Sequence, residues 1–270
     1  MSTKIHPGSV LFMTLDSCRY DSFVSAHAPN LHAVGRIHKA QAPSYFTYGS
    51  HAAMFVGFTP GVAHEAVALL NPKFGKIFKL AGAGFPGKGR EGFLLEGSNI
   101  IDGFNKLGYY TVGTGAVGWF NPAASTSRVL IADFKEFFYP GVRHSVEEQL
   151  CWIDRCLEVA CEGPVFVFIN IGETHVPYYF KGAPWPANDN CCVPFQVVDR
   201  SEECRMRQIC CVEFVDRQIG GLLSRFLAAT TLVTADHGDC WGEDGLWEHG
   251  VSHPMTLSVP LVLRMHGRVI

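Results

Sequence analysis

The sequence has little excess charge of either sign, no long apolar run and no paired-cysteine motif. Its formal net charge is −3, which excludes a strongly basic surface and argues against nucleic acid as a partner. The longest apolar runs, such as residues 165–171, are far too short to cross a bilayer, so no membrane anchor is expected. Residues 1–8 lack the pattern of a cleaved signal peptide. The resulting expectation is a cytoplasmic protein.

The ten cysteines contain no Cys-x-x-Cys pair, so a structural zinc knuckle is not expected. In a chain without a signal peptide, the simplest expectation is reduced thiols. Many of these thiols would be buried as small apolar side chains.

The chain has 270 residues, of which 47% are hydrophobic and 17% are charged. This composition is typical of a compact globular protein. We predict a single domain over residues 1–270. Short apolar runs alternate with longer helix-like segments, which favours an α/β fold with a mainly parallel sheet covered on both faces. Strands are predicted at residues 9–15, 109–112, 165–171, 231–234 and 259–263, and helices at 50–58, 146–161 and 203–227.

Two long segments interrupt this alternation, the glycine-rich residues 80–97 and residues 181–200, which carry prolines, asparagines and cysteines. Long loops in compact domains often form lids or substrate walls. A plain surface insertion is the alternative for both segments.

Polar side chains follow three of the predicted strands. Asp16 comes after the first strand, and Asp236 and His237 follow the strand at 231–234. Glu173 and His175 follow the strand at 165–171. Ligands of parallel sheets bind outside the carboxyl ends of the strands, so these groups are expected at one edge. Acid and imidazole side chains there predict a metal site, with a simple turn cap as the alternative for each.

Thr47 lies just before a helix that is predicted to start near Ser50. Its hydroxyl would meet free backbone N–H groups and the positive end of the helix dipole, which favour phosphate oxygens. The alternative is that Thr47 or Ser50 only caps the helix.

Taken in order, these segments resemble the alkaline phosphatase/sulfatase superfamily, and the resemblance runs through nearly the whole chain. The matching segments are Leu15-Asp-Ser-Cys-Arg-Tyr-Asp21, Pro29-Asn-Leu31, Ala42-Pro43, Thr47, Ser50-His-Ala52, residues 57–60, Gly108-Tyr-Tyr-Thr111, His175-Val-Pro-Tyr178, Val215-Asp216, Thr234-Ala-Asp-His-Gly238 and Val259-Pro-Leu261. The resemblance implies a three-layer α/β/α sandwich with a metal-assisted nucleophile at the sheet edge.

Carried over to this sequence, the resemblance implies that Asp16, Thr47, Asp236 and His237 bind one divalent cation tightly, with Thr47 also the nucleophile. Two carboxylates, a hydroxyl and an imidazole suit Zn²⁺ or Mn²⁺ best, with Mg²⁺ or Ca²⁺ as alternatives. The resemblance assigns His175 and His249 to substrate contact, and either could protonate the leaving oxygen.

Several further residues keep two interpretations. Glu173 and His253 are candidates for a weaker second cation or for substrate contact, and His253 competes with His249 for the same role. A hydrogen-bonded structural role is preferred for His51 and His253. Arg19 and Asp21 are expected to brace the first loop rather than react.

Departures from the family pattern narrow the chemistry. Classical sulfatases carry a Cys or Ser at the position of Thr47, followed by Pro and Arg. Residues 47–51 are Thr-Tyr-Gly-Ser-His here, so sulfate-ester hydrolysis is disfavoured. The lysine and histidine that follow Gly-Tyr-x-Thr in sulfatases are replaced by Thr114-Gly-Ala-Val-Gly118. Gly172-Glu-Thr-His175 lacks the Asp-to-His spacing of a full second metal site. A threonine nucleophile is typical of the phosphodiesterase and phosphoethanolamine-transferase branches.

The chain ends soon after residues 259–263, so we expect it to lack most of the smaller C-terminal subdomain of many relatives. The wall of the site would then come from residues 80–97, from residues 181–200 or from another subunit of a homo-oligomer.

The prediction is a metal-dependent hydrolase of a small phosphate monoester, diester or related phosphorus ester, acting through a phosphothreonine. Alternatives within enzymes are a sulfatase-like or phosphonate hydrolase and a phosphoethanolamine-type transferase. The alternative outside enzymes is a non-catalytic, metal-stabilised ligand-binding protein.

Overall fold

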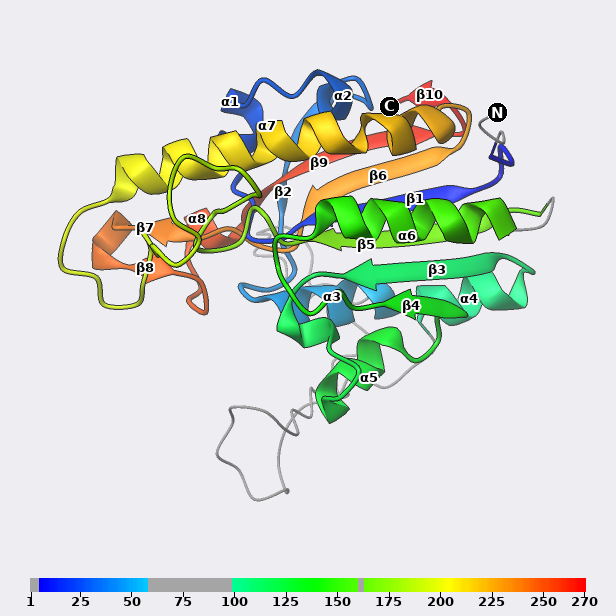
Figure 1. The fold of residues 1–270 in the computed structure, drawn as a ribbon, viewed down its shortest axis with the longest axis horizontal. Coiled ribbons are helices and arrows are strands. Elements are labelled where there is room, and N and C mark those ends of the chain that lie inside the picture. Colours follow the sequence, from blue (N-terminus) through cyan, green and yellow to red (C-terminus); the bar gives the residue numbers. More distant parts are fainter. Residues whose placement is uncertain (1–4, 58–98, 160–162) are drawn as a thin grey trace, which may run out of the picture.

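A central sheet organises the chain, and the computed structural model describes residues 5–57, 99–159 and 163–270 of it (Figure 1). The predicted loop at residues 80–97 lies outside these ranges. Strands follow the order β10-β9-β6-β1-β5-β3-β4, and β2 pairs with β9. Their bounds are β1 Val10–Leu15, β2 Ile37–Gln41, β3 Tyr110–Gly115, β4 Glu136–Phe138, β5 Val165–Ile171, β6 Thr230–Ala235, β9 Ser258–Met265 and β10 Arg268–Val269.

The middle of the sheet is parallel, as predicted. Strands β4, β3, β5, β1 and β6 run in one direction, whereas β9 is antiparallel to β6. Strand β2 and strand β10 are both antiparallel to β9. A separate two-stranded hairpin is formed by β7 Cys240–Trp241 and β8 Trp247–Glu248.

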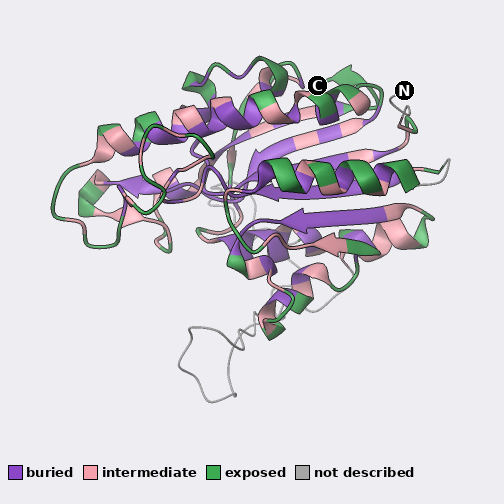
Figure 2. Cartoon of the chain, in the orientation of Figure 1, coloured by how far each residue is buried: buried purple, intermediate pink, exposed green. Residues whose placement is uncertain are grey.

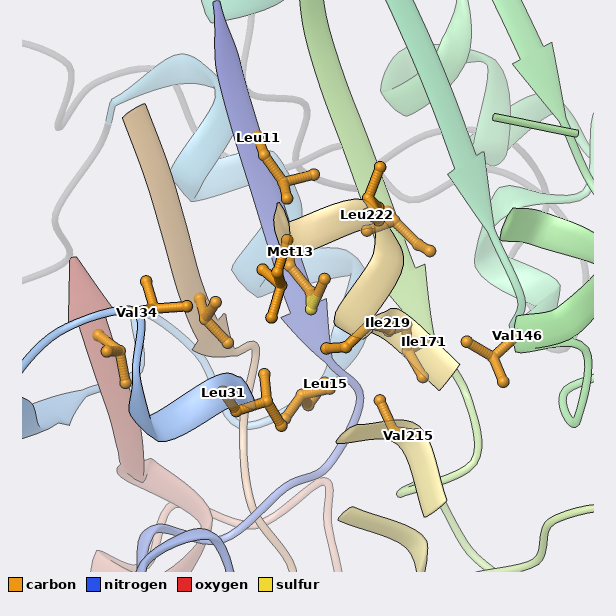
Figure 3. Close-up of a cluster of buried hydrophobic side chains, with 14 of the residues drawn as sticks. Leu11, Met13, Leu15, Leu31, Val34, Val146, Ile171, Val215, Ile219 and Leu222 are labelled. Atoms are coloured by element: carbon orange, nitrogen blue, oxygen red, sulfur yellow. The ribbon is translucent and has the colours of Figure 1, made fainter. Parts of the chain in front are cut away.

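Alternating side chains of the central strands fill two separate cores, because successive residues of a strand point to opposite faces. On β1, Leu11, Met13 and Leu15 join the first core, which includes Val215 and Ile219 of α7 (Figure 3). Phe12 points to the second core, where it meets Phe55 of α3. A fully buried leucine contributes about 2 kcal/mol to stability by leaving water.

Helices cover both faces, which confirms the three-layer α/β/α prediction. The first face carries α1 Tyr20–Ser25, α2 Pro29–His32, α6 Val146–Val159 and α7 Ser201–Arg225, and the second carries α3 Thr47–Val56, α4 Ile100–Lys106 and α5 Ser125–Ile131. The strands between them are largely buried, and the helices keep exposed outer stripes (Figure 2).

Strand register sets the position of the functional edge. Leu15 at the end of β1 is paired with Ile171 of β5 and with Ala235 of β6. The residues that follow, Asp16 and Asp236, therefore leave the sheet side by side. The β7–β8 hairpin and α8 Pro254–Leu257 lie beyond this edge (Figure 1).

Two smaller expectations concern the cysteines and membrane-spanning helices. The nine described cysteines are free thiols, and six of them are buried. Within the described ranges, no helix combines the length and apolarity needed to cross a membrane.

Candidate active site

Three buried side chains at the ends of β1 and β6 form the centre of the site. Asp16, Asp236 and His237 have no exposed surface. One ligand atom of each lies within 4.8 Å of the others. The sequence predicted these three residues as partners, and the register of β1 with β6 brings them together.

The two carboxylates are incompletely paired for groups so deeply buried. Asp236 Oδ1 accepts hydrogen bonds from the backbone N–H groups of Ser17 and His237, both at 3.0 Å. Its Oδ2 is buried without a hydrogen-bond partner, and Asp16 Oδ2 accepts one from Asn170 Nδ2 at 3.0 Å.

The electrostatics follow from this arrangement. Burial raises the pKa of Asp236 to about 7. Burial and the nearby Asp236 carboxylate raise the pKa of Asp16 to about 7 as well. Two adjacent buried carboxylates with one oxygen unpartnered are costly unless a cation lies between them. The residues present therefore fit a divalent metal ion.

His237 offers the neutral imidazole that such a site needs. Its Nδ1 lies 2.9 Å from the carbonyl oxygen of Gly238, a contact that holds the hydrogen on Nδ1 and leaves the Nε2 lone pair free. Burial, assisted by the nearby His249, lowers the pKa of His237 to about 4. The Nε2 atom lies 3.3 Å from Thr47 Oγ1, so the threonine hydroxyl is beside the metal-ligating group.

Thr47 is the first residue of α3, three residues earlier than the predicted helix start. Phe46 is the extended N-cap residue, and the first helical bond runs from Ser50 N to Phe46 O. The N–H groups of residues 47–49 precede that bond and are available to a ligand. Thr47 is nearly fully buried, as a protected nucleophile would be.

His51 has the structural role that was preferred for it. Its Nδ1 lies 2.8 Å from the carbonyl oxygen of Thr47, and its Nε2 lies 3.0 Å from Thr14 Oγ1. The ring therefore ties the start of α3 to β1.

A second group of donors, Asp239 with His249, shares His237 with the first. Asp239 Oδ1 lies 2.7 Å from His249 Nδ1, and Asp239 Oδ2 accepts a 2.7 Å bond from the Tyr178 hydroxyl. The Tyr178 oxygen in turn accepts a 2.8 Å bond from Trp241 Nε1. Burial opposes the charge on His249, but Asp239 raises the pKa of this histidine to about 9.

Asp239 was missed by the sequence analysis, although a signal for it exists. The β7–β8 hairpin pairs Cys240 with Glu248, so Asp239 and His249 flank the first pair of the hairpin. Recognition of a tight hairpin at residues 240–248 would have predicted that this acid and this histidine meet.

His175 lies beside His249, as its predicted role in substrate contact requires. The two ring centroids are 5.1 Å apart, and the His249 centroid is 4.5 Å from that of His237. His175 Nδ1 lies 2.8 Å from Val176 O and 3.2 Å from Arg143 Nη1. Arg143 was not singled out by the sequence because nothing near it in the chain suggests a site.

Two other candidates have different positions. Glu173 Oε1 accepts a 2.8 Å bond from the backbone N–H of Val146, so this carboxylate caps the start of α6 rather than facing the metal group. His253 caps α8 through Met255 N, and its Nε2 lies 3.2 Å from Asp244. Among the described residues, neither belongs to a group that could bind a metal. The structure thus places His249, and not His253, at the site.

Arg19 braces the first loop, as expected. Its guanidinium pairs with Asp21 and with Glu243, both at 2.7 Å, and stacks 4.0 Å from the Trp241 ring centroid. These contacts link the loop after β1 to the β7–β8 hairpin.

The segment at residues 181–200 contains no helix or strand and packs near the same hairpin. Cys191 and Cys192 are buried against Tyr178 and Trp241. Val197 lines a cavity of about 560 Å³ together with Trp241 and Trp247. The prediction that this segment forms a wall of the substrate site stays a prediction.

No family model matches the sequence, and no curated protein matches it. Solved structures do resemble the fold. The C-terminal periplasmic domain of EcEptC from Escherichia coli, in complex with zinc, has 11% identity and a TM-score of 0.65 over 98% of this chain and 74% of its own. The same domain of the phosphoethanolamine transferase EptC from Campylobacter jejuni has 11% identity and a TM-score of 0.61, with coverages of 96% and 80%.

A third structure extends the similarity to hydrolases. The phosphonate monoester hydrolase of Agrobacterium radiobacter has 14% identity and a TM-score of 0.55, covering 97% of this chain and 70% of its own.

These neighbours correct the expectation of a cytoplasmic protein, because the two EptC structures are periplasmic domains. The expectation relied on a missing signal pattern in residues 1–8. Segments that direct export or anchor a protein lie outside a folded catalytic domain. The missing signal pattern in residues 1–8 therefore does not show in which compartment the protein works.

Three observations lead to one conclusion. They are the order of the strands, the position of the candidate metal-ligating group at their carboxyl ends and the similarity to these structures. The chain has the fold of the alkaline phosphatase superfamily.

Proposed function

We propose that this chain is a metal-dependent phosphoryl-transfer enzyme in which Thr47 attacks the phosphorus atom of a phosphate ester. The observation that carries the proposal is the position of the Thr47 hydroxyl. It lies 3.3 Å from His237 Nε2, which in turn lies 3.5 Å from the Asp236 Oδ2 atom that has no hydrogen-bond partner.

Asp16, Thr47, Asp236 and His237 would hold the cation, and their oxygen and nitrogen donors favour Zn²⁺ or Mn²⁺. A bound cation favours the deprotonated hydroxyl and offsets charge on the phosphoryl oxygens. The N–H groups of residues 47–49 at the start of α3 can donate hydrogen bonds to the same oxygens.

His249 is placed to supply the proton for the leaving group. The Asp239 carboxylate keeps its imidazole protonated near neutral pH and leaves Nε2 as the free donor. In the first step, the Thr47 Oγ–P bond forms while the bond to the leaving oxygen breaks, and that oxygen takes the proton. In the second step, the oxygen of water or of an alcohol bonds to phosphorus while the Thr47 Oγ–P bond breaks, which releases the Thr47 oxygen, and the attacking molecule gives its proton to His249.

Hydrolysis and transfer differ only in the molecule that attacks the phosphothreonine. Similarity to the phosphoethanolamine transferase EptC from Campylobacter jejuni favours transfer to an alcohol as the second candidate function. Product analysis in the presence of a soluble alcohol separates the two, because a transferase forms a new ester and a hydrolase forms free phosphate or phosphomonoester.

The Thr47→Ala variant tests the proposal. With metal content unchanged, it should lose at least about a thousandfold in turnover, because no covalent intermediate can form. The turnover assay should use an aryl phosphate monoester, a phosphodiester, a phosphonate and a sulfate as substrates. The Thr47→Ser variant keeps a hydroxyl and should retain part of the activity. Full activity of Thr47→Ala would overturn the nucleophile. Ligand binding without turnover or a phosphoryl adduct on Thr47 would show a non-catalytic binding protein.

A further inference from the structure

Arg143 lies at the rim of the site and forms no ion pair with any described residue. Its Nη1 donates to the carbonyl oxygen of Val176 at 2.8 Å and lies 3.2 Å from His175 Nδ1. Within the described residues its remaining N–H groups have no acceptor, and no carboxylate lies within ion-pairing distance of it. Arg19, by comparison, is paired with two carboxylates. A guanidinium whose N–H groups are free can bind an oxyanion through two parallel hydrogen bonds.

The loop that carries Arg143 is held in place from three sides. At its end, Val146 N donates to the buried carboxylate of Glu173 at 2.8 Å. The His144 ring packs edge-on against Tyr179, with centroids 4.9 Å apart. A Cβ atom at Gly172 would lie only 2.6 Å from the carbonyl oxygen of Arg143, so glycine permits this close approach. The position of Arg143 is thus built into the fold, because its loop between β4 and α6 packs against Gly172, just after the carboxyl end of β5.

The surroundings of Arg143 contain both signs of charge. Burial raises the pKa of the Glu248 carboxyl, and Arg143 is near enough to oppose this rise slightly, without forming an ion pair. The His249 imidazolium is neutralised by Asp239, whose second oxygen is used by Tyr178. Asp239 therefore has no free oxygen for Arg143.

Contacts from Arg143 to the nucleophile pass through three imidazoles. They run from Arg143 to His175, then to His249 and His237, and from there to Thr47. Arg143 is thus separated from the phosphoryl group that Thr47 would attack. It can instead contact another part of the same substrate.

We propose that Arg143 binds a second oxyanion of the substrate, a carboxylate or a phosphate, while the reacting phosphoryl group lies at Thr47. This inference rests on the proposed function and adds the substrate class, a phosphate ester that carries a second negative charge. Glu173 and Gly172 act as positioning residues that deliver Arg143 to the site.

Equilibrium binding tests the inference without turnover. The zinc-loaded full chain is titrated calorimetrically with propylphosphonate, with phosphonopropionate, which adds a carboxylate, and with propylene bisphosphonate, which adds a second phosphonate. The variants are Arg143→Gln, Arg143→Lys and, as a matched control on the exposed side of α6, Arg155→Gln.

The wild-type protein should bind at least one doubly charged probe about tenfold more tightly than propylphosphonate. Arg143→Gln should remove that preference, Arg143→Lys should keep part of it, and Arg155→Gln should keep all of it. The probe that is preferred decides between carboxylate and phosphate. Equal binding of all three probes by the wild type, or a preference that survives in Arg143→Gln, would overturn the inference.

The two proposals fail separately. A preference that depends on Arg143, together with full turnover by Thr47→Ala, would leave the oxyanion site standing and reject the threonine nucleophile. Turnover that depends on Thr47, with no preference among the probes, would reject only the oxyanion site. If no probe binds the wild type, the oxyanion site is rejected, and turnover of Thr47→Ala alone decides the nucleophile.

Discussion

Asp236 and Asp239 are fully buried carboxylates three residues apart, and the structure gives them opposite environments. Asp236 keeps one oxygen without a hydrogen-bond partner, and burial raises the pKa of this carboxyl to about 7. Both oxygens of Asp239 are used, one by His249 and one by Tyr178. Burial disfavours its charge, but the His249 imidazolium holds the pKa of Asp239 below its usual value.

The difference separates two halves of the site. The half around Asp16 and Asp236 has two neighbouring carboxylates, whose charge a bound cation would offset. The half around Asp239 and His249 is already neutralised within the chain, as expected for a group that orients and protonates. His237 belongs to both halves and connects them.

The largest effect is expected for Asp236→Asn. Loss of this charge should remove most of the bound metal and at least about a thousandfold of the turnover. Zinc at a hundred times its dissociation constant should stabilise the wild type by about 2.7 kcal/mol and should leave the variant nearly unaffected. Metal analysis and thermal unfolding measure both effects, and Asp239→Asn, which should keep most of its metal, is the comparison. Normal metal content in Asp236→Asn would contradict the prediction that Asp236, unlike Asp239, is needed to bind the metal.

A smaller and more selective effect is expected for Asp239→Asn. The amide can accept the bond from His249, but it does not supply the charge that keeps the imidazole protonated. Turnover should fall about ten- to a hundredfold for esters of poor leaving groups and much less for aryl esters, whose leaving group needs no proton. A series of substrates graded by leaving-group pKa measures the dependence. An equal loss across the series would argue against proton donation by His249.

The smallest effect is expected for Glu173→Gln, a buried carboxylate outside both halves. Burial raises the pKa of Glu173 to about 7, above the usual 4.5 of a glutamate side chain. A raised folded-state pKa gives stability that is present below pH 4.5 and is lost as the pH rises through about 7. The variant lacks this loss, so at pH 8 its free energy of unfolding should exceed that of the wild type by roughly 1 kcal/mol.

Denaturant unfolding at several pH values between 4 and 8 checks the Glu173 prediction. Glu148→Gln, an exposed neighbour at the start of the same helix, is the control and should follow the wild type. A constant difference between Glu173→Gln and the wild type at all pH values would show that burial does not perturb this carboxylate.

Much of the fold could be predicted because the long elements have strong local patterns. Residues 165–171 were predicted as a strand and form β5 with the same bounds, since every residue there is buried. The predicted helix at 203–227 corresponds to α7 Ser201–Arg225. Short elements were missed. Strand β2 has no regular alternation of buried residues, and only its pairing with β9 makes it a strand.

The site was predictable where adjacent residues carry the chemistry. Asp236 and His237 are neighbours in sequence, and the parallel register with β1 adds Asp16. For Glu173 and Asp239, the position after a strand did not predict the role of the side chain. Both acids follow strand β5 or β6 closely, yet one caps α6 and the other holds His249.

By itself, the sequence determined the layered α/β fold, the edge of the sheet that carries chemistry and the types of ligand available there. These properties follow from hydrophobic periodicity and from strand ends, which are local in the chain. Only the tertiary structure decided which carboxylates are satisfied and which histidine is charged. Those properties depend on distant partners, such as Ser17 for Asp236 and Tyr178 for Asp239, because burial and hydrogen bonding are set by whatever the folded chain packs around each group.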